Sequence, residues 1–149
     1  MSGQNSAKLN FEHPGVIAYI EQLQGIMSRM AANSANCKVC AVTILAAVMA
    51  LSKLNGYSKF WLCLFPTLLM LLADCYYLGL ERRFKEICNR FVNEVREGKD
   101  PELFSIPKTG FCTQLAGIWG GLRSISTFPF YALLAIVPLV IIWVDNIND

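Results

Sequence analysis

The sequence FWLCLFPTLLMLLADCYYLGL, residues 60–80, is the clearest structural signal in the chain. Its 21 residues include a single charged side chain, that of Asp74. A helix that crosses the hydrocarbon core of a bilayer needs about 20 predominantly apolar residues. The stretch therefore predicts a transmembrane helix that carries one acidic residue.

Two further apolar stretches flank this one. Residues 127–144 read TFPFYALLAIVPLVIIWV and carry no charge, whereas the stretch at about 39–54 is shorter and needs the small and polar residues before it in order to span. The chain is 54% hydrophobic and 16% charged, which is little charge for a soluble domain of 149 residues. We predict an all-α membrane protein with three transmembrane helices, at about 39–54, 60–80 and 127–144.

The second of these helices is expected to continue beyond the membrane. No proline occurs between Leu80 and Glu97, and Gly98 follows as a common C-terminal signal. Oppositely charged residues stand four apart along this segment, which stabilises a helix: Glu81 and Lys85, Arg82 and Glu86, Arg90 and Glu94. We predict one helix from Phe60 to about Glu97 whose second half forms a cytoplasmic stalk.

Residues 1–38 are predicted to form a cytoplasmic region built around an amphipathic helix. Pro14 suits a first helical turn, and apolar residues then recur every three or four positions, at Val16, Ile20, Leu23, Met27 and Met30. Two interpretations stay open: the apolar stripe packs on the remaining helices, or it lies on the membrane surface. A second stripe, between Phe111 and Ile125, predicts a helix against the inner leaflet or the base of the bundle.

The distribution of basic residues predicts the orientation. Eleven of the 13 lysines and arginines lie before the first span or between the second and third, and two lie between the first and second. The excess marks the cytoplasmic side. The N-terminus and residues 81–126 are therefore expected inside, the C-terminus outside, and residues 39–149 form the transmembrane domain. Aromatic residues agree: Tyr57, Trp61 and Trp143 at the outer interface, and Tyr76, Tyr77 and Trp119 at the inner one.

Catalytic and metal sites are not indicated by the sequence. The six cysteines are interpreted as small buried hydrophobic residues in a reducing compartment. Cys37 and Cys40 form one isolated C-x-x-C pair, and His13 is the single histidine, too few ligands for a closed zinc site. Neither a catalytic triad nor a phosphate-binding loop is recognisable. We expect no enzyme activity, no metal and no cofactor.

Asp74, Tyr77 and Pro66 are the candidate pore or gate residues. An aspartate at the centre of a membrane helix costs about 2.5–3.5 kcal/mol, so Asp74 is not expected to face lipid. It lines a pore, or it has a structural role bonded to Tyr77, Thr43 or a neighbouring subunit. Pro66 interrupts the second span and can kink it, although prolines are also common in ordinary membrane helices.

A set of basic residues is the candidate site for an anionic ligand. The phenylalanines Phe84 and Phe91 lie between them, so they suit a nucleotide, a nucleic acid or an anionic lipid. The alternative is that the charges serve topology and salt bridges. On the first span, small residues at 46, 47 and 50 allow close helix contact, between subunits or within one. The candidate ligand-binding residues are Arg29, Lys38, Arg82, Arg83, Lys85 and Arg90.

Two segments carry a resemblance to a known family. LQGIMSRMAANSANCK (residues 23–38) and LLMLLADCYYLGLERRFKEICNRF (residues 68–91) are similar to the patterns Q-x-I-I-x-R-M-A-x-N-S-x-x-x-K and D-x-Y-Y-L-x-x-E-R-x-F. The chain thus resembles small bacterial membrane proteins encoded beside nucleotidyltransferases in phage-defence loci, such as the membrane effectors of the Hailong system. The likeness covers residues 20–92. The matching residues are Gln24, Arg29, Asn33, Ser34, Lys38, Asp74, Tyr76, Tyr77, Glu81, Arg82 and Phe84; Cys40 and Ile87-Cys88 depart from the pattern.

The resemblance implies a function. It implies a homo-oligomeric, tetrameric pore in the bacterial inner membrane that depolarises the cell and arrests growth during infection. A single-stranded DNA or nucleotide signal, made by the neighbouring nucleotidyltransferase, would control it from the cytoplasm. Two other hypotheses stay open: a passive membrane anchor that recruits a cytoplasmic partner, and a membrane enzyme or small transporter.

Overall fold

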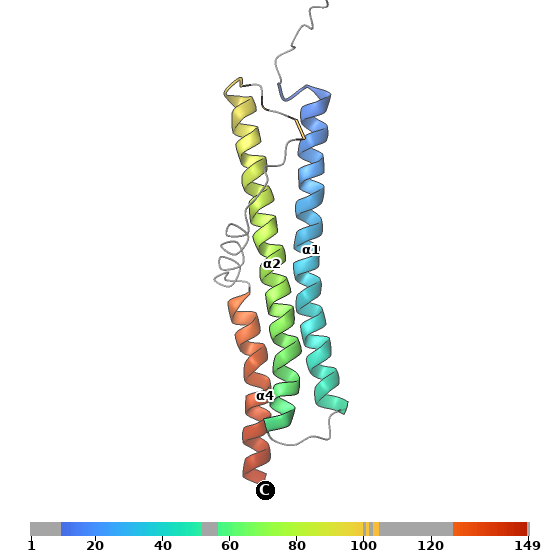
Figure 1. Cartoon of the computed structure of the whole chain (residues 1–149), viewed down its shortest axis with the longest axis vertical. Helices are drawn as coiled ribbons and strands as arrows, with labels where there is room; N and C mark the ends of the chain where they lie inside the picture. Colours follow the sequence, from blue (N-terminus) through green and yellow to red (C-terminus); the bar gives the residue numbers. More distant parts are fainter. Residues whose placement is uncertain (1–9, 52–56, 100, 102, 105–126, 149) are drawn as a thin grey trace, which may run out of the picture.

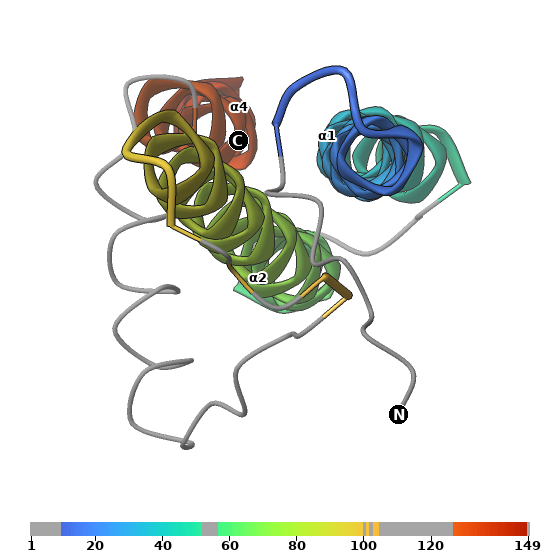
Figure 2. The same cartoon turned by 90° about the horizontal axis from the view of Figure 1, so that it is seen from above.

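The computed structural model describes residues 10–51, 57–99, 101, 103–104 and 127–148. Within them the chain is helical, as the sequence predicts: α1 is Pro14–Leu51, α2 is Tyr57–Arg96 and α4 is Phe128–Asn148. α1 and α2 run antiparallel, side by side over nearly their whole length (Figures 1 and 2). At a rise of about 1.5 Å per residue, each of these two helices is on the order of 60 Å long.

The third described helix, α4, gives the molecule two different ends. It packs along the N-terminal half of α2 and runs antiparallel to it, so that the end of α4 lies beside the start of α2 (Figure 1). We call this half, which contains the most apolar sequence, the three-helix end. The other half contains α1 and α2 without α4, and we call it the two-helix end.

Contacts between α1 and α2 fix how the helices are aligned. The rings of Tyr19 and Phe91 meet near one end, with centroids 4.7 Å apart. At the other end, Cys63 Sγ lies 3.6 Å from Met49 Sδ. Between the two, Ser34 contacts Asp74. We use "height" for the position along the common long axis of α1 and α2. A residue of α1 and a residue of α2 lie at the same height when their numbers add up to about 110. This relation gives the height of the other residues of the two helices.

The start of α1 is defined by His13 and Pro14. The ring Nδ1 of His13 accepts a hydrogen bond from the backbone N–H of Gly15 at 3.1 Å, and its carbonyl accepts from Val16 N–H at 2.9 Å. His13 is thus the N-cap, and Pro14 occupies the first helical position, where it needs no N–H partner. The sequence placed Pro14 correctly in the first turn.

α1 continues without a break through residue 38, where the sequence predicts the boundary between the cytoplasmic region and the first span. It is continuous from Pro14 to Leu51. The physical reason is that no proline or glycine occurs between residues 26 and 51, and the polar residues in the middle of the helix have partners on α2. The predicted outer part of this span, residues 52–54, lies outside the described residues.

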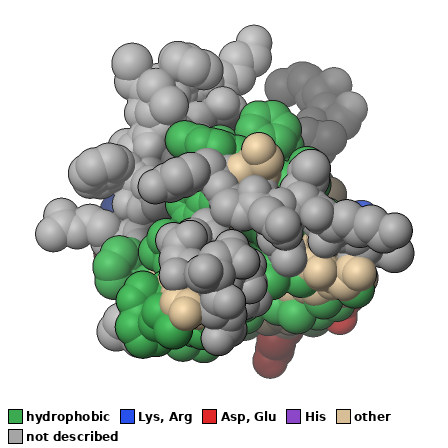
Figure 3. Space-filling model, turned by 90° about the horizontal axis from the view of Figure 1, so that it is seen from below, with side chains coloured by type: hydrophobic (Ala, Val, Ile, Leu, Met, Phe, Trp, Pro, Cys, Tyr) green, Lys and Arg blue, Asp and Glu red, His purple; other side chains and the backbone are tan. Residues whose placement is uncertain are grey.

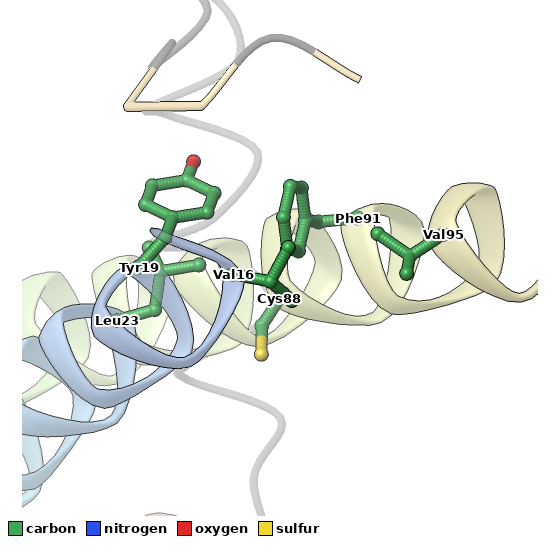
Figure 4. Close-up of a cluster of buried hydrophobic side chains, with 6 residues drawn as sticks. All are labelled: Val16, Tyr19, Leu23, Cys88, Phe91 and Val95. Carbon is green, nitrogen blue, oxygen red and sulfur yellow. The ribbon is translucent and has the colours of Figure 1, made fainter. Parts of the chain in front are cut away.

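The two-helix end is held together by an apolar core (Figure 4). Val16, Tyr19 and Leu23 of α1 are at most 2% exposed and pack with Cys88, Phe91 and Val95 of α2. Around this core lie the half-buried residues Ile20, Met27, Phe84, Ile87, Val92 and Leu103. The apolar stripe predicted for the N-terminal helix thus packs against α2, the first of its two interpretations. The second predicted stripe, Phe111 to Ile125, lies outside the described residues.

Gly98 ends α2, as the sequence predicts. It adopts a left-handed conformation with φ 71°. Its N–H donates to the carbonyl of Val95 at 3.1 Å, and the N–H of Lys99 donates to the carbonyl of Glu94 at 3.0 Å. This pair of hydrogen bonds is the Schellman motif, which glycine adopts without steric strain.

We predict that Gly98→Ala lowers the free energy of unfolding by roughly 1–2 kcal/mol. The loss is conformational, because a Cβ at Gly98 would meet nothing within 4 Å. Gly25→Ala is the matched control: it also has open space, but it lies in regular helix, so we expect a gain of about 0.5–1 kcal/mol. Thermal unfolding followed by circular dichroism in detergent measures both. Equal effects of the two substitutions would contradict the assignment of Gly98 as the helix cap.

Among the described side chains, apolar ones predominate on the surface of the three-helix end (Figure 3). Trp61, Phe65, Leu133 and Trp143 are each about two-thirds exposed. By length and composition, two helical segments are able to cross a membrane, Pro14–Ala50 and Phe60–Arg96, and α4 contributes a shorter apolar run, Phe128–Val140. An exposed apolar surface of this extent is typical of a protein that meets lipid or a partner there.

Candidate functional site

The main polar feature between α1 and α2 is a cluster formed by Ser34, Lys38 and Asp74, which we call the Asp74 cluster. The Asp74 side chain is fully buried. Its Oδ1 accepts a hydrogen bond from the Ser34 hydroxyl, and the Lys38 ammonium lies 2.7 Å from its Oδ2. Lys38 Nζ also donates to Ser34 Oγ at 3.2 Å. The carboxylate is therefore held on one side by a hydroxyl and on the other by a counter-charge.

Helix geometry brings these three groups together. Ser34 and Lys38 are four residues apart in α1, so they share one face of the helix. The alignment of α1 with α2 places Asp74 opposite this face. The Lys38 side chain is 19% exposed, so its ammonium reaches the carboxylate while its stem passes to the surface.

The cluster solves the electrostatic problem that Asp74 creates. A buried charge without a partner is strongly unfavourable, and a counter-charge at ion-pair distance offsets most of that penalty. Asp74 Oδ2 accepts no well-directed hydrogen bond from any described residue, so its interaction with Lys38 is chiefly ionic. The stability of the cluster therefore depends on Lys38 more than on Ser34.

The Asp74 cluster keeps a carboxylate and an ammonium paired inside the protein. Ser34 is 4% exposed, so a substrate has no access to its hydroxyl in this conformation. The Lys38 ammonium is engaged by the Asp74 carboxylate at 2.7 Å. Both features suit an ion pair that holds two helices together. The contact between α1 and α2 is stable while Lys38 and Asp74 are paired, and separating the two charges is unfavourable.

α4 lies next to this cluster. Tyr131, which is 5% exposed, donates its hydroxyl to the carbonyl of Met70 at 3.2 Å. Met70 stands one helical turn before Asp74 on α2, so the start of α4 is level with the Asp74 cluster. The sequence analysis did not single out Tyr131. Its only sequence signal was a lone tyrosine at the start of an apolar span.

The structure gives Asp74 different partners from those considered in the sequence. Tyr77 is half-buried, and its ring meets that of Tyr76 with centroids 5.7 Å apart. Thr43 donates its hydroxyl to the carbonyl of Val39 on its own helix at 2.9 Å. The partners are Ser34 and Lys38. These partners were not recognised from the sequence. The signal that could have indicated them is a serine and a lysine four residues apart, just before an apolar stretch.

Pro66 lies inside α2 without ending it. Proline lacks the N–H that would bond to the carbonyl four residues earlier. In the following position, the Thr67 hydroxyl donates to the carbonyl of Cys63 at 2.8 Å, which adds a polar contact to this turn. Pro66 thus lies in the three-helix end, about two helical turns from Asp74.

The predicted ligand-binding residues do not form one group. Lys38 is engaged in the Asp74 cluster. Arg29, Arg82, Lys85 and Arg90 are exposed, and Arg83 is half-buried. The alignment places Arg29 at about the height of residue 81, close to Arg82 and Arg83. Arg90 lies farther toward the tip of the two-helix end.

The described cysteines are free thiols: Cys37, Cys40, Cys63, Cys75 and Cys88. Burial raises the pKa of the Cys88 thiol above its ordinary value, which keeps it protonated and unreactive. No group of three or more potential metal ligands gathers among the described residues. Cys112 lies outside them.

Comparison with known proteins identifies no relative: no family model, no curated protein and no solved structure matches the chain. The fold, the Asp74 cluster and the resemblance noted in the sequence are therefore the basis for the functional proposal.

Proposed function

We propose that the chain is a three-span protein of a bacterial inner membrane that assembles into a pore. In this arrangement α4 and the apolar halves of α1 and α2 lie in lipid, and the two-helix end stands in the cytoplasm as a stalk. The 21 residues of α4 extend about 30 Å, which equals the thickness of the hydrocarbon core. The exposed apolar side chains of the three-helix end support the same placement.

The basic residues support the orientation. Arg29, Arg82, Lys85 and Arg90 belong to the half of the molecule without α4, and the positive-inside rule places such residues in the cytoplasm. The N-terminus is then inside, and the end of α4 is outside. Residues 105–126, which include Lys108 and Arg123, lie outside the described residues and are assigned to the cytoplasm by sequence alone.

The observation that carries the pore proposal is the Asp74 cluster. A buried ion pair adds little net stability compared with apolar packing, so its presence between two membrane helices favours a functional role. We interpret it as the closed state of a gate, in which Lys38 and Ser34 shield the carboxylate. When α1 and α2 move apart, Asp74 becomes available to water and to cations.

Control from the cytoplasm is the second part of the proposal. The exposed basic residues of the stalk suit an anionic signal, either a nucleotide or single-stranded DNA. The resemblance to phage-defence proteins supports a partner nucleotidyltransferase as its source and a homo-oligomer, a tetramer, as the conducting form. Depolarisation of the membrane and growth arrest would follow when the gate opens.

Current recording in planar bilayers tests the pore. We expect purified protein to conduct ions, and Asp74→Asn to change the open probability at least several-fold because it removes the charge from the gate. Glu97→Gln is the control, since it removes an exposed carboxylate that pairs with Lys99 on the stalk. A single-stranded oligonucleotide should shift the wild-type currents. Absence of current with and without oligonucleotide would remove the pore from consideration.

A passive anchor is the alternative function. One observation favours it: Asp74 is neutralised within a single chain, so the described conformation needs no conducting state to explain this charge. An anchor predicts that Asp74→Asn leaves the host phenotype unchanged while substitutions in the stalk abolish it. A pore predicts that Asp74→Asn changes toxicity. Membrane depolarisation in growing cells separates the two.

A further inference from the structure

The exposed basic residues of the stalk fall at two heights above the Asp74 cluster. Arg82 and Lys85 follow Asp74 by eight and eleven residues, which corresponds to about 12 and 16 Å along α2. The alignment of the helices places Arg29 of α1 at nearly the same height. We call Arg29, Arg82 and Lys85 the lower basic group. The upper basic group is Arg90, Arg96 and Lys99, whose first member lies about 24 Å from Asp74.

The distance of each basic group from the lipid depends on where the cytoplasmic edge of the hydrocarbon layer lies along α2. Tyr76 is 42% exposed and stands six residues before Arg82. Tyrosine side chains concentrate at the membrane interface, so Tyr76 marks the cytoplasmic edge of the hydrocarbon in the arrangement proposed above. Arg82 is then about 9 Å above this edge. The polar headgroup layer is about 5–8 Å deep, and arginine and lysine side chains extend several ångströms toward it.

The upper basic group is out of reach of that layer. Arg90 stands about 21 Å above Tyr76 and Arg96 about 30 Å. Both distances exceed the Debye length of about 8 Å at physiological ionic strength, so headgroup charges are screened there. The two groups therefore meet different surroundings, although both belong to the same stalk.

Charge at the lower height is positive on balance. Arg82 and Lys85 are three residues apart on one exposed face of α2, and Arg83 lies between them at a half-buried position. Two acidic residues share this height, Glu81, which is half-buried, and Glu86, which is exposed. With Arg29, four basic residues at this height outnumber two acidic ones.

From this placement we propose that the lower basic group binds the headgroup phosphates of anionic phospholipids in the cytoplasmic leaflet. The group would fix the depth of α1 and α2 in the membrane, whereas the upper group, whose Lys99 pairs with Glu97, would stay clear of the lipid. The inference rests on the membrane placement proposed above. It does not require that the protein conducts ions or that it responds to nucleic acid.

Lipid-dependent unfolding tests this inference. Full-length protein in detergent receives phosphatidylglycerol or phosphatidylcholine, and the unfolding temperature is measured. We expect phosphatidylglycerol to raise it by several degrees and phosphatidylcholine to leave it unchanged. The triple variant R29Q/R82Q/K85Q should lose the increase. The matched variant R90Q/R96Q/K99Q also loses three charges from the stalk and should keep the increase.

Other outcomes would overturn the proposal. An equal loss in both triple variants would show that net charge, not the lower group, attracts the lipid. If a short single-stranded oligonucleotide raises the unfolding temperature and R29Q/R82Q/K85Q abolishes that effect while lipid binding persists, the lower group binds nucleic acid instead. Native mass spectrometry counts retained phosphatidylglycerol below the unfolding temperature, so a destabilised variant still gives an answer. Lipid binding without current would sustain this inference and remove the pore.

Discussion

Lys38→Met is expected to lower the free energy of unfolding by about 3–5 kcal/mol, the penalty for leaving one member of a buried ion pair without its partner. Asp74 is fully buried, so its charge cannot turn toward solvent when Lys38 is replaced. Methionine keeps much of the length and apolar character of the lysine stem, which isolates the effect of the charge. Thermal unfolding in detergent, followed by circular dichroism, measures the loss.

The reverse substitution provides the control. Asp74→Asn leaves Lys38 without its counter-charge, but the lysine side chain is already 19% exposed and its flexible stem can carry the ammonium to the surface. We therefore expect a smaller loss. The double variant Lys38→Met with Asp74→Leu should recover most of the stability, since apolar replacements of a buried ion pair are often neutral or stabilising. Equally small effects of both single substitutions would show that the pair is not buried in the detergent-solubilised protein.

Phe91→Ala is expected to have the second large effect, again a loss of about 3–5 kcal/mol. Phe91 is 4% exposed and lies at the centre of the core of the two-helix end, with its ring edge-on to that of Tyr19. Among the described residues, only α1, α2 and Leu103 enclose this core, so few neighbouring side chains are able to fill the resulting cavity. Chemical denaturation of the detergent-solubilised protein measures the change in the free energy of unfolding.

Phe104→Ala is the matched control for Phe91→Ala. Phe104 also contacts the ring of Tyr19, with centroids 5.3 Å apart, but it is 56% exposed. Its removal deletes an aromatic contact without opening a buried cavity, so we expect a loss of less than about 1 kcal/mol. If Phe91→Ala proved as mild as Phe104→Ala, the stalk would owe little of its stability to the apolar core.

The bounds of α2 followed closely from the sequence. The prediction was a helix from Phe60 to about Glu97, and the structure has Tyr57–Arg96. The reason is local: an apolar run, charge pairs four residues apart and a C-terminal glycine are properties of neighbouring residues. The boundary predicted at residue 38 falls inside the continuous helix α1, and it stays a prediction because a single helix can pass from the cytoplasm into a membrane. Asn33, Ser34 and Lys38 read as a polar boundary when only neighbours along the chain are considered.

The candidate site was predictable in part. Asp74 was recognised because a single charge in an apolar run is visible in the sequence. Its partners were not, since Ser34 and Lys38 precede it by 40 and 36 residues and meet it only through the alignment of two antiparallel helices. Lys38 was consequently grouped with the stalk arginines as a ligand-binding residue. In the structure, the partner of Lys38 is Asp74. The membrane function and the identity of the ligand stay predictions.

α1 has no proline after Pro14 and no break between the tip of the stalk and the outer end, while the Asp74 cluster joins it to α2 near its midpoint. A stiff rod fastened at its middle behaves as a lever with two arms of comparable length. The two helices already pack together at the two-helix end, so a force that parts them there is passed through the fastening and tends to press the opposite ends together. In the membrane arrangement proposed above, a signal that binds the stalk would in this way set the spacing of the helices inside the bilayer.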